Sequence, residues 1–459
     1  MLFNSQVFIL IFLPVVLGLY YLAAGNRRAR QSLLVVASLG FYGWWDVRFV
    51  PLLIGLTISN WLIAAWFARI TVRWIPVLGV ALNLAVLGLF KYADFLRGSV
   101  FGVLDLDWRP WSLILPLGIS FFVFQKISYL IDLRRGDRHI YGFLDFALFV
   151  SFFPQLIAGP LVRHNEIIHQ FDADPRGPAM WENLSRGFTL FIIGVAKKVA
   201  LADTLAMVAD PLFAKAANGS LSAAEAWTAA GAYTLQIYFD FSGYSDMAIG
   251  LARMFGFRLP MNFDAPYRSL SIREFWRRWH MTLSRFLRDY LYIPLGGGRS
   301  GAARQALNVI LTMLLGGLWH GANWTFVVWG GLHGAALALN HLWQLHGRAL
   351  PRPIAWLLTM LFVMVGWVLF RSPGFAAAWD MLASMAGTHG LGRAVLSQES
   401  TAALILGTIL AVAGPTSQRM ALELTRPRSW TAAALGAGLA GILVLIGGRL
   451  PNVFIYFQF

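Results

Sequence analysis

Two histidines lie in apolar surroundings, where an ionisable side chain is costly to bury. His320 follows Leu318 and Trp319 in a long hydrophobic run, and His280 follows a short segment rich in arginine and tryptophan. Ionisable residues inside hydrophobic stretches are rare and mark functional sites by default. A neutral imidazole can remove a proton or carry an acyl group. The pair therefore predicts proton or acyl-group chemistry at a membrane surface.

The neighbours of His320 favour a site that another group approaches closely. Glycines stand at positions 316, 317 and 321, and without a side chain they let a backbone or a substrate come near. Trp319 and Asn323 are candidate supporting residues, and the amide of Asn323 can form hydrogen bonds. The alternative is a structural histidine that bonds to one backbone carbonyl.

Arginines accompany His280. Arg277 and Arg278 precede it by three and two positions. A neighbouring cation favours the neutral imidazole, the form that accepts a proton. The same two arginines could bind the phosphates of a cofactor that arrives from the cytoplasm. Contact with lipid headgroups explains them equally well.

Two carboxylates stand in another apolar stretch, at Asp240 and Asp246. Carboxylates at membrane depth need partners or protons. Six residues apart, they point to different faces of a helix, which argues against an acid–base pair. We expect Asp240 to be a supporting residue that pairs with arginine or backbone. The segment after His320 offers no second ligand at a usual spacing, so no metal site is expected.

The other seven histidines carry weaker signals. His333 lies on the predicted helix that follows His320, where a supporting role and a merely structural one both stay open. The rest lie in or near predicted connections and are expected to be solvated or at headgroup level. They are His139, His164, His169, His341, His346 and His389.

The composition sets the class of protein. Of 459 residues, 58% are hydrophobic and 13% are charged, against about 25% charged in soluble domains. The predicted fold is an all-α polytopic membrane protein, with a single membrane domain over 1–459. The net charge of +15 comes mostly from arginine in short connections, as expected for cytoplasmic loops and anionic lipid. A nucleic-acid partner is not expected.

Absent residue types and motifs exclude several chemistries. The chain has no cysteine, which excludes disulfides, thiolate metal sites and an acyl-enzyme on a thiol. The glycine triplet at 296–298 has no following Lys-Ser/Thr and no preceding strand, so it is not a phosphate-binding loop. No internal repeat is visible, which lowers the case for a secondary transporter.

Hydropathy predicts about 11–13 membrane helices. The first apolar run precedes its arginines, so it reads as a retained span with the N-terminus outside, and the basic connections of the first five spans then fall inside. The predicted spans are 6–23, 32–45, 50–68, 74–92, 111–132, 143–162, 184–210, 225–252, 305–319, 323–345, 354–371, 401–418 and 431–449.

The segment 268–304 interrupts this pattern with eight arginines against two acidic residues. Its spacing predicts one amphipathic interfacial or re-entrant helix at the cytoplasmic surface, ended by Pro294 and the glycine triplet. The residues expected on its apolar face are Phe275, Trp279, Leu283, Phe286 and Tyr290.

Several ordered motifs resemble the membrane-bound O-acyltransferase family, in particular the membrane subunits of alginate O-acetyltransferases. The resemblance covers nearly the whole chain. It rests on Val7–Pro14, Pro116–Phe122, Phe239–Asp246, Arg273–His280, Leu318–Gly321 and the terminal Phe454-Ile455-Tyr456-Phe457.

The resemblance implies a ring of membrane helices around a thin centre, where a cytoplasmic and an extracytoplasmic cavity meet. It makes His320 the essential histidine and His280 the second site position. It further implies an acetyl group, with acetyl-CoA as donor, that crosses the bacterial inner membrane for O-acetylation of an exopolysaccharide such as alginate.

The resemblance also implies partners and leaves alternatives. No Gly-x-Ser-x-Gly occurs, so a separate periplasmic SGNH or hydrolase-like acetyltransferase is expected to esterify the polymer, within a polysaccharide biosynthesis complex. D-alanyl transfer from an acyl carrier protein would give an alanyl ester instead. A proton-coupled transporter, with His320 and the two aspartates as a relay, would move solute without any acyl donor.

Overall fold

The computed structural model describes residues 1–459 except 138, 220, 300, 426–427, 449–453 and 456–459. Tyr456 and Phe457 of the terminal motif therefore lie outside the described residues. Every regular element in the described ranges is helical, which confirms the all-α class. The chain divides into two compact units that are each discontinuous in sequence.

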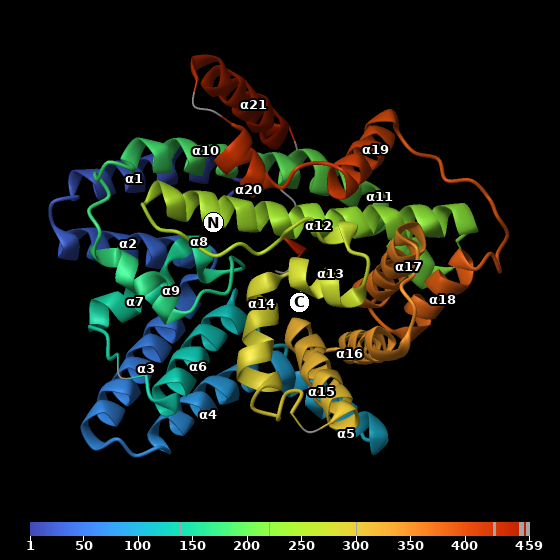
Figure 1. Ribbon diagram of the computed structural model, residues 1–459, viewed down its shortest axis with the longest axis horizontal. Helices are drawn as coiled ribbons and strands as arrows, with labels where there is room; N and C mark the ends of the chain where they lie inside the picture. The colour runs from blue at the N-terminus through green and yellow to red at the C-terminus, as the bar shows by residue number, and fades with distance from the viewer. Residues whose placement is uncertain (138, 220, 300, 426–427, 449–453, 456–459) are drawn as a thin grey trace. The chain divides into compact units, whose positions relative to one another are not determined.

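The first unit comprises Met1–Ile193, Tyr244–Pro260 and Ala421–Pro451. Within it α2 packs on α1 and α7, and α4 packs on α3 and α6 (Figure 1). Its longer helices are α1 (Leu13–Leu22), α2 (Arg27–Gly43), α3 (Val50–Ile70), α4 (Ile75–Leu87), α5 (Ala93–Val103), α6 (Ile119–Arg135), α7 (Phe143–Ser151), most of α10 (Met180–Ala196) and α21 (Ser429–Gly447).

The second unit comprises Gly194–Gly243, Met261–Met420 and Asn452–Phe459, and it contains both candidate histidines. The long α12 (Ala223–Met254) begins in this unit and ends in the first. The unit's other helices are α11 (Asp203–Asn218), α13 (Ile272–Arg278), α14 (Met281–Leu287), α15 (Ala302–His320), α16 (Trp324–His346), α17 (Arg352–Arg371), α18 (Phe375–Met385), α19 (Gln398–Val412) and α20 (Ser417–Arg419).

Fewer helices are long and apolar enough to cross a membrane than the sequence predicts. Five of the described helices are long and apolar enough to cross a membrane, or six if the bent pair Gln398–Val412 and Ser417–Leu424 is one crossing. The predicted span 143–162 is wrong. There α7 ends at Ser151, the short α8 covers Phe153–Leu156, and no helix follows until residue 164. Pro154 and the Gly159–Pro160 pair disfavour a continuous helix here.

The single amphipathic helix predicted within 268–304 is also wrong. α13 begins where the Ser271 hydroxyl accepts the N–H of Glu274 at 3.1 Å, and it ends at Arg278. The chain then turns at His280 before α14 begins. The predicted apolar residues from Phe275 to Tyr290 are nevertheless all buried. The apolar spacing was informative, but a helical pattern does not reveal a two-residue break within it.

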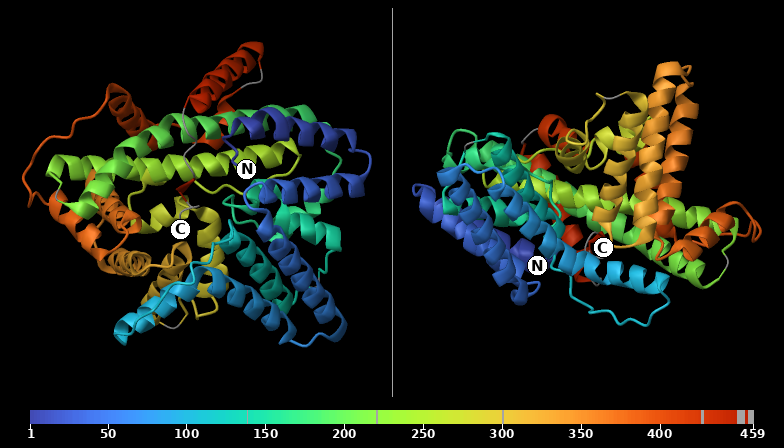
Figure 2. Two further views of the ribbon diagram at one scale, coloured as in Figure 1. Left: turned by 180° about the vertical axis from the view of Figure 1, so that it is seen from behind. Right: turned by 90° about the horizontal axis from the view of Figure 1, so that it is seen from below.

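Glycines let α15 and α16 run unusually close together, as the right view of Figure 2 shows. A Cβ atom at Gly330 would collide with the backbone carbonyl oxygen of Met313, and one at Gly317 with that of Phe326. At Gly334 it would lie 2.7 Å from the Cα atom of Ile310. Small residues at such an interface allow backbones to make direct contact.

We expect Gly330→Ala to destabilise the protein, because the added methyl meets backbone rather than a movable side chain. Overpacking of this kind costs about 1–3 kcal/mol. The measurement is the midpoint of thermal unfolding in detergent. Gly331→Ala is the matched control, since its Cβ meets only the end of the Leu314 side chain. Equal midpoints for the two variants would contradict the packing argument.

Candidate functional site

The second unit brings the two predicted histidines together. The ring centroids of His280 and His320 lie 6.4 Å apart. His280 is fully buried, and His320 is 4% exposed. Trp319 lies beside both, with centroids 4.9 Å from His320 and 6.1 Å from His280. Two polar rings at this separation can act on one small substrate group.

His280 occupies a strained position in the backbone. It precedes the first residue of α14 with φ 44° and ψ 52°, in the left-handed region that non-glycine residues rarely adopt. Such conformations persist only where surrounding contacts fix them, and they concentrate at functional sites. Here the Asn262 carbonyl accepts the N–H of Met281 at 2.9 Å, which holds the turn.

Asn262 also fixes the tautomer of His280. Its side-chain oxygen accepts the backbone N–H of Thr282 at 3.3 Å and the Thr282 hydroxyl at 2.8 Å. The Nδ1 atom of His280 lies 3.2 Å from the same oxygen and must therefore donate to it. In the neutral ring the lone pair is then on Nε2. The side chain of Phe241 packs edge-on against this ring at 4.7 Å.

Burial, rather than the arginine cluster, keeps His280 neutral. It lowers the pKa of His280 to about 3, in a segment outside the apolar helices that could cross a membrane. Arg278, predicted to assist, forms ion pairs with Glu274 at 3.0 Å and Asp264 at 3.4 Å. Arg277 is exposed on α13. Of the two predicted phosphate ligands, Arg277 is thus the more accessible.

Aromatic side chains from three helices surround His320. Trp329 of α16 packs edge-on against it with centroids 5.3 Å apart, and Phe370 of α17 lies at the same distance. Trp367 stacks on Trp329, and its indole N–H donates to the hydroxyl of Tyr267 at 3.2 Å. These rings exclude water, which strengthens electrostatic interactions with the imidazole.

The turn after His320 depends on Gly321 and Asn323. A Cβ atom at Gly321 would collide with the ring of Phe326. The Asn323 side chain accepts the N–H of Thr325 at 3.1 Å and donates to the carbonyl of Pro373 at 2.9 Å. Asn323 thus caps α16. The structure gives it a role in positioning α16, which carries Trp329.

Asp240 is a buried member of an ion cluster. It lies 2.7 Å from the Lys198 ammonium, which also contacts Asp203 at 2.7 Å. The N–H of Ile455 donates to the other Asp240 oxygen at 2.9 Å. The expected backbone partner is thus present, but lysine stands where arginine was expected. A π-helical turn, Lys197–Ala202, carries Lys198.

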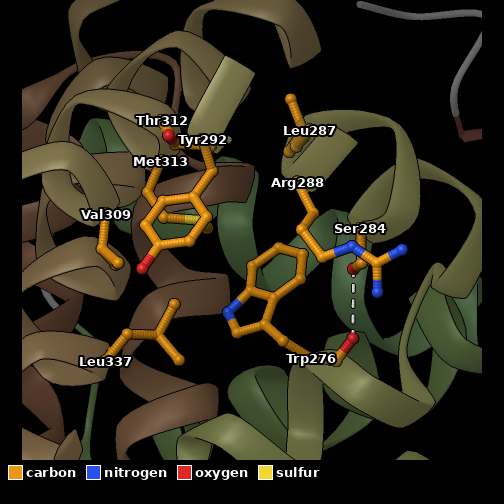
Figure 3. Close-up of a pocket in the computed structure, with 9 residues that line it drawn as sticks. All are labelled: Trp276, Ser284, Leu287, Arg288, Tyr292, Val309, Thr312, Met313 and Leu337. Carbon is orange, nitrogen blue, oxygen red and sulfur yellow. Dashed lines mark hydrogen bonds between the residues drawn. The ribbon is translucent and has the colours of Figure 1, made fainter. Parts of the chain in front are cut away.

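A cavity of about 160 Å³ lies between α13, α14 and the α15–α16 pair (Figure 3). Its walls are mainly apolar, with Arg288 among the lining residues. The Ser284 hydroxyl donates to the Trp276 carbonyl at 3.0 Å and joins α14 to α13. The lining residues are Trp276, Ser284, Leu287, Arg288, Tyr292, Val309, Thr312, Met313 and Leu337.

His164 corrects one expectation about the remaining histidines. It is fully buried in the first unit rather than solvated. Its Nε2 atom lies 3.3 Å from Asp132, and its Nδ1 atom lies 3.0 Å from the Tyr141 hydroxyl. Polar partners on both nitrogens explain how a histidine in a predicted connection tolerates burial.

Sequence reasoning missed Asn262, Phe241, Trp329 and Phe370. Trp329 had a usable signal, because it stands four residues before His333 and so shares its helix face. Asn262 had none, since its link to His280 arises from a loop that returns to the turn. No group of three or more metal-ligating side chains occurs among the described residues.

A family model described as MBOAT, membrane-bound O-acyltransferase family, matches residues 68–371. The chain is 45% identical over 424 residues to the probable alginate O-acetylase AlgI of Pseudomonas aeruginosa, with 89% of this chain and 79% of that protein covered. It is 41% identical over 438 residues to the peptidoglycan O-acetyltransferase of Helicobacter pylori, with coverages of 87% and 82%.

A more distant similarity extends over half of the chain. The teichoic acid D-alanyltransferase of Streptococcus thermophilus is 29% identical over 243 residues, which is 50% of this chain and 58% of that protein. The three names share acyl transfer to a cell-envelope or secreted polymer. They differ in the acyl group and in the polymer.

We expect Lys198→Met to lower the free energy of unfolding by about 3–5 kcal/mol, because it removes the counter-ion of the buried Asp240. The matched control is Lys215→Met. Lys215 pairs with Glu225 at 2.7 Å but is 52% exposed, and such pairs contribute about 0–1 kcal/mol. Denaturant titration in detergent measures both. A loss no greater than that of the control would refute the assignment.

The buried His280 makes stability depend on pH. In the unfolded chain its pKa returns to about 6.5, whereas the folded value is about 3. Between these values only the unfolded state binds the proton, so stability falls as pH drops from 6.5 towards 3. We expect the unfolding midpoint of His280→Asn to fall less than that of the wild type between pH 7 and 4.

The control for this comparison is His346→Asn, at an exposed position on α16. Its midpoint should follow the wild-type pH dependence. If His280→Asn and the wild type gave parallel curves, the burial of a neutral His280 would be wrong.

Proposed function

The chain belongs to the membrane-bound O-acyltransferase family and is an O-acyltransferase with several membrane helices. From this premise we propose that it takes an acetyl group from a cytoplasmic donor, acetyl-CoA, and passes it across the bacterial inner membrane. The acetyl group then reaches hydroxyls of an exopolysaccharide such as alginate. Similarity to the alginate O-acetylase of Pseudomonas aeruginosa supports the polymer class.

One observation carries the proposal: the ring centroids of the buried His320 and His280 lie 6.4 Å apart among aromatic side chains. An acyl-transfer enzyme without cysteine needs another base or nucleophile, and imidazole can serve as either. His320 is the catalytic residue of the proposal. His280, held as the Nδ1–H tautomer by Asn262, orients the donor or the acceptor through the Nε2 lone pair.

Two routes fit this geometry. In the first, the neutral ring of His320 removes the proton of the acceptor hydroxyl as its oxygen attacks the acetyl carbonyl carbon. In the second, a ring nitrogen of His320 attacks first and carries the acetyl group until the acceptor takes it. Both routes release the thiol of the donor and form an ester.

The donor is proposed to approach from the cytoplasmic side, along the segment 268–304. Arg277 is exposed there and can meet a phosphate, since guanidinium groups form strong hydrogen bonds with phosphate oxygens. Arg278 is a weaker candidate, because ion pairs with Glu274 and Asp264 already hold it. Contact of these arginines with anionic headgroups is compatible with the same placement.

The proposal includes a periplasmic partner and an orientation. The N-terminus lies on the periplasmic side, so the basic connections of the first spans face the cytoplasm. A separate SGNH or hydrolase-like acetyltransferase receives the acetyl group and esterifies the polymer within the biosynthetic complex.

D-alanyl transfer is the second candidate, and the similarity to teichoic acid D-alanyltransferases favours it. It would use an acyl carrier protein in place of CoA and would give alanyl esters. Mass spectrometry of the modified polymer distinguishes acetyl from alanyl esters directly.

We expect His320→Ala to abolish acetyl-ester formation while the protein still inserts in the membrane. General acid–base catalysis accelerates a reaction roughly 10²–10⁴-fold. We therefore expect the rate to fall by at least about 10²-fold. The measurement is transfer of labelled acetyl from acetyl-CoA in inverted membrane vesicles, together with the acetyl content of the secreted polymer.

His346→Ala is the control, because His346 lies exposed at the far end of α16. It should keep the wild-type rate at the wild-type protein level. Normal acetylation by His320→Ala at a normal protein level would overturn the catalytic assignment.

A further inference from the structure

A hydrogen bond fixes the tautomer of a third buried histidine. His333 lies in α16 and is 1% exposed. The indole N–H of Trp276 donates to its Nδ1 atom at 3.1 Å. An indole nitrogen can only donate, so Nδ1 must carry the lone pair and Nε2 must carry the proton. His333 is therefore a fixed N–H donor, in contrast to His280.

Trp329 supplies a second donor next to it. It precedes His333 by four residues on the same helix face, and the two ring centroids lie 4.7 Å apart. Neither His333 Nε2 nor Trp329 Nε1 has a hydrogen-bond partner within the described part of the chain. A buried donor without an acceptor costs about 1–3 kcal/mol, so two adjacent ones need an explanation.

Both nitrogens lie close to the same residue of α17, Gly366. A Cβ atom built on Gly366 would lie 3.1 Å from His333 Nε2 and 3.4 Å from Trp329 Nε1. Contacts this short are tighter than most that a Cβ atom makes, so a methyl group at residue 366 would crowd both N–H groups. The glycine thus leaves these two N–H groups, the donor pair, uncovered by any side chain of residue 366.

The donor pair lies one helical turn from the surroundings of His320. Phe370, whose ring centroid is 5.3 Å from that of His320, follows Gly366 by four residues on the same face of α17. The ring of Trp329 itself packs against His320. A small group held by the donor pair would therefore remain beside the imidazole.

We propose that the donor pair binds the carbonyl oxygen of the acyl group that His320 transfers. The inference rests on the proposed function and deepens it. The acceptor oxygen bonds to the carbonyl carbon while its proton passes to His320, and the C=O electron pair moves onto the carbonyl oxygen. When the C–S bond then breaks, the thiolate leaves with the proton from His320. An acyl-histidine route places the same charge on the same oxygen.

The chemistry of the donor pair selects this ligand. Two neutral N–H groups favour an oxygen acceptor, and they gain most when that oxygen becomes negative. A cation or a second donor would meet no lone pair on either nitrogen. The phosphates of the donor are matched instead by guanidinium groups such as that of Arg277.

Trp329→Phe is the sharpest test, because it keeps the aromatic ring and removes only the N–H. His333→Met removes the second donor, and His333→Gln returns an N–H donor near the same position. Loss of one donor of this kind lowers kcat by roughly 10²–10³-fold. We expect such a fall for Trp329→Phe and His333→Met with the KM for acetyl-CoA nearly unchanged, and partial recovery for His333→Gln.

A spectroscopic readout separates this role from a structural one. The probe is a ketone analogue of acetyl-CoA, with CH₂ in place of sulfur and a ¹³C-labelled carbonyl. Binding to the wild type should lower its infrared carbonyl frequency, and Trp329→Phe should lose part of that shift. Trp343→Phe is the matched control, because its N–H donates to the Arg348 carbonyl at the end of α16.

The outcomes are distinct. Wild-type kcat and carbonyl frequency in Trp329→Phe, with His320→Ala inactive, would overturn the donor pair and leave the proposed function intact. If Trp329→Phe lowered the thermal stability but left kcat per folded protein unchanged, the donor pair would likewise be overturned. Activity in His320→Ala would overturn the proposed function itself. Should His333→Met fail to fold, Trp329→Phe still decides the question.

Discussion

The backbone contact between α15 and α16 is the constraint on which the candidate site depends. Gly317 and Gly330 meet where any side chain would strike a carbonyl oxygen of the opposite helix. Trp329 directly precedes Gly330, so this contact sets how near the indole comes to His320. Protein interiors are packed as densely as organic crystals, so a change in the separation of the two helices would also move the side chains between them. The glycines therefore determine the distance at which the imidazole and its aromatic wall meet.

Neighbouring buried groups give opposite tautomers to two histidines, His280 and His333. An amide oxygen makes His280 a donor at Nδ1 and leaves the lone pair on Nε2, whereas an indole N–H gives His333 the opposite tautomer. The first ring can accept a proton at its distal nitrogen, and the second can only donate there. Residue type alone would assign the same role to both. The polarity of one contact atom decides between base and hydrogen-bond donor.

The sequence predicts the class and the two histidines, because an imidazole in an apolar run is costly wherever it occurs. It does not predict the break at His280, since a left-handed residue stabilised by Asn262 leaves no trace in apolar spacing. The apolar sequence around Asp240 predicts that this carboxylate is buried and needs a partner. That the partner is Lys198 follows from a π-helical turn that no periodicity reveals. The free-energy cost of burying an ionisable residue can be inferred from the residues around it in the sequence. The distant residue that offsets this cost cannot.

Adjacent residues of α12 link the charged cluster to the site. Asp240 and Asp203 both contact one ammonium, that of Lys198. The N–H of Ile455 donates to Asp240 and gives this buried carboxyl group a second polar partner. The next residue, Phe241, contacts both Phe454 and the ring of His280. Phe454 and Ile455 thus connect the buried Asp240 with Phe241, the ring against which His280 packs.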